Sequence, residues 1–141
     1  MLHLINIKHR IVIKEYTLLF FRVGISVLMI YGHGYGKLLK LISGEDIQFA
    51  DPIGLGVKAS FYLVVFAEVL CSVLIMFGLK TRLAAMVLVV NMFVAAVEMF
   101  AKNSFPELAL MYLLSYLLIL IFGAGKFSVD YTLNKKTKRK H

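Results

Sequence analysis

Four long apolar runs limit what this sequence can fold into. They cover roughly residues 17–33, 59–79, 83–101 and 107–123, and few charged residues interrupt them. Each run is close to the roughly 20 residues that a helix needs to cross the hydrocarbon core of a bilayer. Because lipid offers the backbone no hydrogen-bond partners, and because barrel-type alternation is absent, each run is predicted to be helical. The predicted fold is all-α: a polytopic membrane protein with an antiparallel bundle of four transmembrane helices.

The composition supports a membrane location for this single domain. Hydrophobic residues make up 60% of the 141 residues, whereas soluble domains average roughly 45–50%. A chain of this length has too little interior to bury that excess. The net charge of +8 does not indicate a nucleic acid partner, because the cations gather at the ends of the apolar runs. Cations in such places contact anionic lipid headgroups, so the bilayer is the expected partner.

The distribution of Lys and Arg predicts the orientation. Eleven of the sixteen lie on the side of the termini and four lie on the other side, if there are four spans. Since cytoplasmic segments carry the excess of cations, both termini are predicted to be cytoplasmic. The chain then has a cytoplasmic N-terminal segment (1–16), a transmembrane domain (17–125) and a basic cytoplasmic tail (126–141). The Lys-rich part of the tail is expected to be disordered, and the loop 37–58 to cap the outer end.

Polar side chains form one stripe on each predicted helix, at spacings of three and four residues. A charged group in hydrocarbon costs about 2.5–3.5 kcal/mol on insertion scales unless it is paired or solvated. The stripes are therefore expected to meet inside the bundle, where they make up the candidate ligand-binding and intramembrane polar residues: Arg22, Ser26, His33, Lys37, Glu68, Asn91, Glu98, Tyr112, Ser115 and Tyr116.

Arg22 and Glu68 are predicted to meet inside the bilayer. They lie about 8 Å and about 15 Å from the inner ends of their predicted helices, a gap that an arginine side chain can span. Two interpretations stay open: a structural ion pair that fixes helix register, or a site for a polar headgroup or proton relay. His33 and Glu98 are both predicted near the outer surface, where either can pair with the other or with Glu107.

The sequence contains no motif for a disulfide, a metal site, a phosphate-binding loop or a catalytic nucleophile. Cys71 is the only cysteine, so an internal disulfide and a cysteine-based metal site are excluded. No histidine pair with metal-ligand spacing, phosphate loop or nucleophile motif occurs, and no metal site is expected. His33 alone favours an interfacial or structural role over a ligand role.

Several segments resemble DoxX family proteins. The run LLFFRVGISVLMIYGHGYGKL is similar to the first span of that family, with Arg22 and the element from His33 to Lys37. The segments FADPIGLG, FAEVLCSVLIMFGLKTRLAA and ELALMYLLSYLLILIFGAGKFSVD continue the resemblance in the same order, over about residues 17–132. Family members often carry a histidine near the end of the third span, where this chain has AAVEMFAKNSFP, so a site of two histidines would need Glu98 as a substitute.

The resemblance implies a four-helix protein of the bacterial inner membrane. The family name derives from small membrane subunits associated with thiosulfate:quinone oxidoreduction and quinol oxidation. The expected function is a small subunit or accessory factor of a quinone-linked redox system, with a quinone as candidate ligand, no covalently bound cofactor and a membrane redox protein as candidate partner. One alternative is a non-catalytic structural or assembly partner of another membrane protein. A second is a small-molecule permease, which four short helices without a repeat disfavour. The sequence names no catalytic residue and leaves open the oligomeric state and whether the chain is an enzyme alone.

Overall fold

Helices account for all the regular structure in the described residues, 2–52 and 54–138, of the computed structural model, and no strand occurs among them. Two rods contain a short π-helical segment, named η, between α-helical parts. The elements in chain order are α1 Leu2–Met29, η1 Ile30–Gly34, α2 Tyr35–Ser43, α3 Val57–Val65, η2 Phe66–Cys71, α4 Ser72–Phe77, α5 Thr81–Ala101, α6 Glu107–Phe122 and α7 Val129–Lys138.

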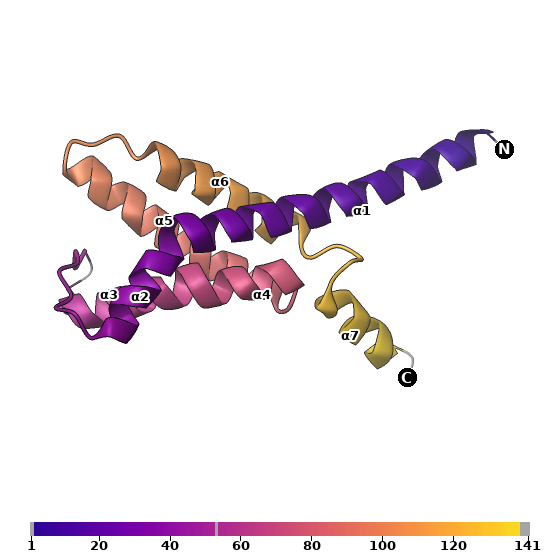
Figure 1. The fold of residues 1–141 in the computed structure, drawn as a ribbon. Helices are drawn as coiled ribbons and strands as arrows, with labels where there is room; N and C mark the ends of the chain where they lie inside the picture. The colour runs from indigo at the N-terminus through magenta and orange to yellow at the C-terminus, as the bar shows by residue number, and fades with distance from the viewer. Residues whose placement is uncertain (1, 53, 139–141) are drawn as a thin grey trace.

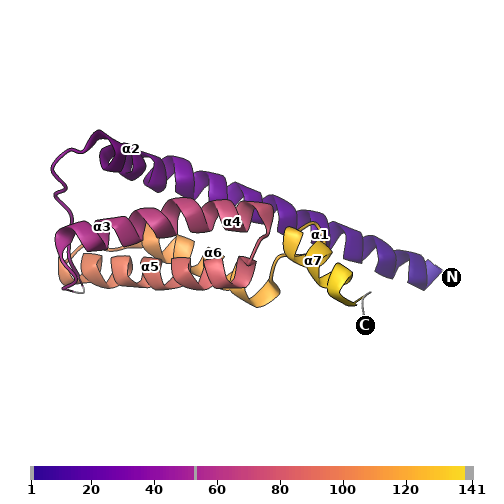
Figure 2. The same cartoon turned by 90° about the horizontal axis from the view of Figure 1, so that it is seen from below.

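The described elements form four helical rods and a short terminal helix (Figure 1). α5 and α6 run antiparallel and share the most extensive contact, while α1 packs on α4 and η1 packs on η2. Both termini lie at the same end of the molecule, and α1 extends beyond the other rods there (Figures 1 and 2). The rods enclose a core centred on Met29, Ile75, Leu88, Tyr116 and Ile119, all fully buried.

Two rods, Val57–Phe77 and Thr81–Ala101, are long and apolar enough to cross a membrane. Less than half of the most apolar stretch of each is buried inside the molecule. The shorter helix Glu107–Phe122 is also apolar and keeps Leu114 62% exposed, while Phe93 on α5 is 58% exposed. Outward faces this apolar are stable in lipid rather than in water.

The first rod is longer than the predicted span of 17–33 and is bent. It is helical from Leu2 to Ser43, so the connecting loop covers only 44–56 rather than 37–58. The rod changes direction at η1 (Figure 1), as helices often do where a π-helical turn interrupts the α-helical hydrogen bonds. The bend brings α2 against α3.

The chain after α6 is attached to the bundle. Asp130, in the first turn of α7, accepts hydrogen bonds from the backbone N–H groups of Lys80 and Thr81 at 2.7 and 2.9 Å. These two N–H groups lie at the N-terminus of α5. Lys80, the N-cap residue, forms no side-chain hydrogen bond that caps the helix. Asp130 therefore caps α5 from another helix. The prediction of a disordered tail is wrong for 129–138, which are helical, while 139–141 lie outside the described residues.

Candidate ligand-binding cleft

Lys37 and Glu68 form an ion pair where the two π-helical segments meet. The Lys37 Nζ lies 2.6 Å from each carboxylate oxygen of Glu68. The Glu68 side chain is only 5% exposed and that of Lys37 26%. A carboxylate buried to this degree needs a cation beside it, because desolvation of an unpaired charge costs several kcal/mol.

A glycine allows the two segments to approach this closely. A Cβ on Gly34 would lie 2.8 Å from Cγ2 of Val69 and 3.4 Å from the backbone of Glu68. Gly34 lies in η1, one turn before Lys37, and packs directly against Glu68, which carries the carboxylate. The backbone approach thus aligns Lys37 with Glu68.

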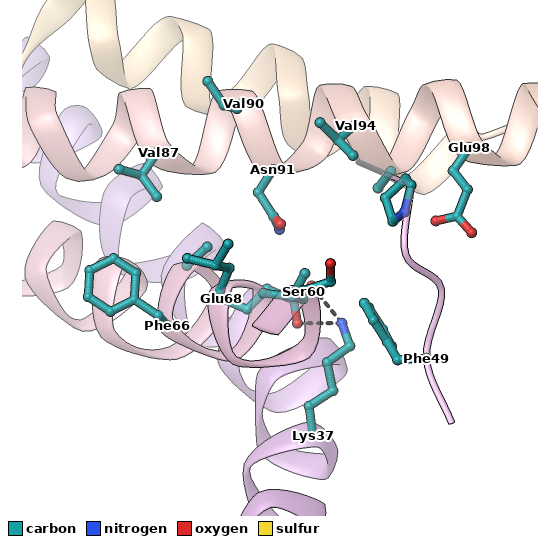
Figure 3. Close-up of a pocket in the computed structure, with 15 residues that line it drawn as sticks. Lys37, Phe49, Ser60, Phe66, Glu68, Val87, Val90, Asn91, Val94 and Glu98 are labelled. Atoms are coloured by element: carbon teal, nitrogen blue, oxygen red, sulfur yellow. Dashed lines mark hydrogen bonds and ion pairs between the residues drawn. The ribbon is translucent and has the colours of Figure 1, made fainter. Parts of the chain in front are cut away.

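The ion pair lies in the wall of an apolar cleft of about 410 Å³ between the second rod and α5 (Figure 3). In Figure 3 Asn91 points from α5 toward the second rod, facing the side on which Glu68 and Lys37 lie. The polar lining residues are few, and the rest are mostly aliphatic: Lys37, Phe49, Pro52, Ser60, Leu63, Val64, Phe66, Ala67, Glu68, Val87, Val90, Asn91, Val94, Ala95 and Glu98. An apolar slot with a few polar groups is the usual form of a small-molecule site.

The loop before α3 borders one end of the cleft, where Phe49 and Pro52 line it. Asp51 accepts hydrogen bonds from the Ser60 hydroxyl at 2.7 Å and from the Gly56 and Leu55 N–H groups at 2.8 and 3.0 Å. The Ser60 hydroxyl and these N–H groups hold the pKa of Asp51 below its ordinary value. The Phe49 ring packs edge-on against Phe61 at 5.3 Å. These contacts hold Asp51 and Phe49 in place beside the cleft.

The predicted contact between Arg22 and Glu68 is wrong. Arg22 donates through Nη1 to the Ala124 carbonyl and through Nη2 to the Phe127 carbonyl at 2.8 Å. It lies beside Gly78, because a Cβ there would come within 2.7 Å of Nη1. Glu68 precedes Gly78 by ten residues, about 15 Å along a helix. The first rod begins well before residue 17, and no residue in it marks its depth in the bilayer, so the apolar pattern does not determine its axial register against the second rod.

Some of the other predicted residues line the cleft, and the rest lie elsewhere in the bundle. Asn91 and Glu98 line the cleft with Lys37 and Glu68, and Glu98 also pairs with Lys102 at 2.6 Å. The residues that lie elsewhere are Arg22, Ser26 and Tyr116, which are fully buried, together with His33, Tyr112 and Ser115.

His33 packs edge-on against Tyr112 at 5.3 Å rather than pairing with Glu98. Tyr112 stacks in turn on Tyr116 at 6.2 Å. Ser115 donates to the Met111 carbonyl of its own helix at 2.8 Å. Among the described residues no three His, Cys, Asp or Glu side chains are grouped as metal ligands would be.

Sequence reasoning missed the aliphatic walls of the cleft and Phe49. Val87, Val90 and Val94 recur at three- and four-residue spacing on the face that carries Asn91. That spacing could have indicated the face, but nothing in the sequence shows which partner helix diverges from it.

Comparison with known proteins assigns the chain to a family. Residues 17–101 match the DoxX family, and the chain belongs to this family of membrane proteins. No curated protein and no solved structure shows significant similarity to the chain.

Proposed function

We propose that the cleft binds a lipid-soluble molecule with a carbonyl-bearing head group, a quinone being the leading candidate. The observation that carries this proposal is the combination of apolar walls with Lys37, Glu68 and Asn91 in one cleft. Lys37 and the Asn91 amide are donors suited to carbonyl oxygens, while the valines of α5 and Phe66 suit a ring. When bound, a quinone would supply two-electron redox chemistry that none of these side chains possesses.

The protein then acts as a small accessory subunit in a quinone-linked redox system. The role of this chain is to hold the ligand in an apolar site with a fixed charge pair, and a membrane redox protein is the partner that exchanges electrons. Neither the residues of the cleft nor the rest of the described chain offers a catalytic group for this purpose, so we assign a binding role.

The proposed setting is the bacterial inner membrane, with four spans and cytoplasmic termini. Two rods have the length and composition for crossing, and the even number of rods agrees with termini at one end (Figure 2). α6 has 16 residues, or about 24 Å, so the bilayer has to thin slightly or flanking residues have to complete the span.

Ligand-induced stabilisation tests the binding proposal. A short-chain ubiquinone or menaquinone analogue should raise the melting temperature of the purified protein, because a ligand at 100 times its Kd stabilises by about 2.7 kcal/mol. The shift should shrink in Asn91→Leu, which keeps the volume but removes the donor, and persist in the lipid-facing control Leu118→Val. If saturating analogue moves neither wild type nor the control, the quinone proposal is wrong and a structural role for the Lys37–Glu68 pair replaces it.

A further inference from the structure

A polar cavity and an apolar groove lie at the end of the bundle that carries the termini, and Phe122 lines both of them. The polar cavity, of about 540 Å³, lies between the start of α5, the end of α6 and α7, and its charged residues are Lys80, Arg82 and Asp130. α7 lies at this end of the molecule (Figure 2). The apolar groove, of about 310 Å³, lies between α1 and α6. Both are separate from the cleft described above.

The polar cavity contains two cations without an ionic partner. Its one carboxylate, that of Asp130, accepts the backbone N–H groups of Lys80 and Thr81. Lys80 and Arg82 are exposed and form no ion pair with any other described residue. The hydrogen bond of Arg82 goes from Nη2 to the Ile121 carbonyl over 3.4 Å. Because a guanidinium has five N–H donors and an ammonium three, the cavity offers an anion both positive charge and donors.

The backbone at Lys80 favours glycine over lysine. Lys80 has φ 47° and ψ 39°, in the left-handed region, where a residue with a Cβ is strained and glycine is not. The chain has glycine at the nearby positive-φ positions Gly78 and Gly123. Strained backbone positions are concentrated at functional sites. A role for the ammonium group in the cavity accounts for a lysine at this turn.

The apolar groove leads from the same end toward the middle of the bundle. It is lined by residues of α1 and α6: Lys14, Thr17, Leu18, Phe21, Leu118 and Phe122. The Nζ of Lys14 lies 5.7 Å from the centroid of the Phe122 ring, and Leu118 lies one turn farther from the end of α6. Leu118 and Phe122 are 46% and 54% exposed. These half-exposed apolar side chains suit a hydrocarbon chain.

We propose that this end of the bundle binds an anionic phospholipid, with its phosphate beside Lys80 and Arg82 and one acyl chain in the apolar groove. Basic pockets between transmembrane helices are usual sites for anionic headgroups. The groove favours a lipid over free phosphate, because only a molecule with a charged and an apolar part fills both spaces. The lipid contacts α1, α5, α6 and α7 and so links the terminal helix to the bundle. The site does not depend on whether the cleft binds a quinone.

Native mass spectrometry of the full chain in detergent, titrated with dioleoyl phosphatidylglycerol, measures the apparent Kd. Each Lys or Arg near an anionic headgroup is worth roughly fivefold in affinity. Lys80→Gly combined with Arg82→Gln should therefore weaken binding by about 30-fold. Lys126→Gln combined with Lys136→Gln removes the same charge from exposed residues at the same end but outside the cavity, and should change the Kd little. Equal weakening in both double variants would show diffuse attraction and overturn the proposal.

The single variant Lys80→Gly separates binding from folding. Glycine adopts the left-handed backbone without strain, so this variant should melt no lower than wild type in lipid-free detergent and still bind the phospholipid more weakly. A lower melting temperature with an unchanged Kd would show that Lys80 serves the fold alone, and the proposal would be wrong.

Three further comparisons test the acyl chain and the charge. Glycerol 1-phosphate, which has no acyl chain, and dioleoyl phosphatidylcholine, which has no net charge, should each bind much more weakly than dioleoyl phosphatidylglycerol. Thr17→Trp fills the groove and should weaken binding of the dioleoyl lipid only, whereas Val12→Trp, five residues away and on the opposite face of α1, should not. If glycerol 1-phosphate binds equally well, the site takes free phosphate. Equal binding of phosphatidylcholine, or an unchanged Kd in Thr17→Trp, would likewise overturn the proposal.

Discussion

At the scale of single residues, the pairing of Lys37 with Glu68 decides the electrostatics of the cleft. The Glu68 carboxylate is nearly fully buried. Each of its oxygens lies 2.6 Å from the Lys37 Nζ, the distance of a strong charge-assisted hydrogen bond. Such a pair contributes less through its own attraction than through the penalty that either partner suffers alone.

Lys37→Met and Glu68→Gln are expected to be individually destabilising and to be coupled. Each should lower the free energy of unfolding by about 2–4 kcal/mol, because the remaining group stays buried without its partner. The double variant should lose less than the sum, with a coupling of about 0.5–3 kcal/mol. Thermal unfolding in detergent measures all four corners of the cycle, and strict additivity would contradict the pairing.

Asp51 gives the loop beside the cleft a dependence on pH. Its pKa is lowered from the ordinary 3.8 by the Ser60 hydroxyl and by N–H groups of the loop. The contribution of the ionised form is therefore complete above the ordinary value and disappears as the pH falls through the lower folded-state value. Hydrogen exchange should show the Gly56 amide losing protection over that acid range. In Asp51→Asn the protection should not vary with pH, and a transition there would assign it to another group.

At the scale of elements, the close approach of η1 and η2 determines where Lys37 and Glu68 meet. Gly34→Ala should be destabilising, because its Cβ would lie 2.8 Å from Val69 and close to the Glu68 backbone. Gly32→Ala, in the same π-helical segment, has open space around it and is the matched control. We expect a loss of about 1–3 kcal/mol at Gly34 and none at Gly32, measured by thermal unfolding. Equal effects would show that glycine flexibility, not packing, matters there.

The helix α7 contributes to stability through Asp130. Asp130→Ala removes the cap of α5 and should cost about 0.5–2 kcal/mol. A chain ending at Asn134 keeps this contact and should melt like wild type, whereas a chain ending at Lys126 should melt at a lower temperature, as Asp130→Ala does. If the Asn134 truncation is as unstable as the Lys126 truncation, the stabilising contact lies in the basic part of the tail instead.

At the scale of the whole molecule, the prediction concerns orientation: the end of the bundle that carries both termini should face the cytoplasm. Reporters active only outside the cytoplasm should give signal when fused after Ser43 or Asn103 and none after Lys80 or Lys136. The physical reason is the excess of cations at the end that carries the termini. Signal after Lys80 would exclude four spans with cytoplasmic termini.

Much of the fold could be predicted because it follows from local patterns. The rods from 57–77, 81–101 and 107–122 match the apolar runs within a few residues, since apolar length and a few breakers such as Gly78 and Pro106 determine where a helix begins and ends. The interior position of Arg22, Ser26, Glu68 and Tyr116 was also predictable, because polar stripes cannot face lipid.

The partners of those residues were decided by tertiary structure alone. The sequence suggested Arg22 as the partner of Glu68, whereas the bend at η1 and the contact at Gly34 bring Lys37 to it. The same packing set Arg22 level with Gly78, against the carbonyls that follow α6. Side-chain periodicity determines which face of a helix is buried, but axial register depends on how neighbouring backbones fit together. The sequence by itself therefore determined that this is a helical membrane protein with a polar interior, and only the packing of the rods determined which charges meet and where the cleft opens.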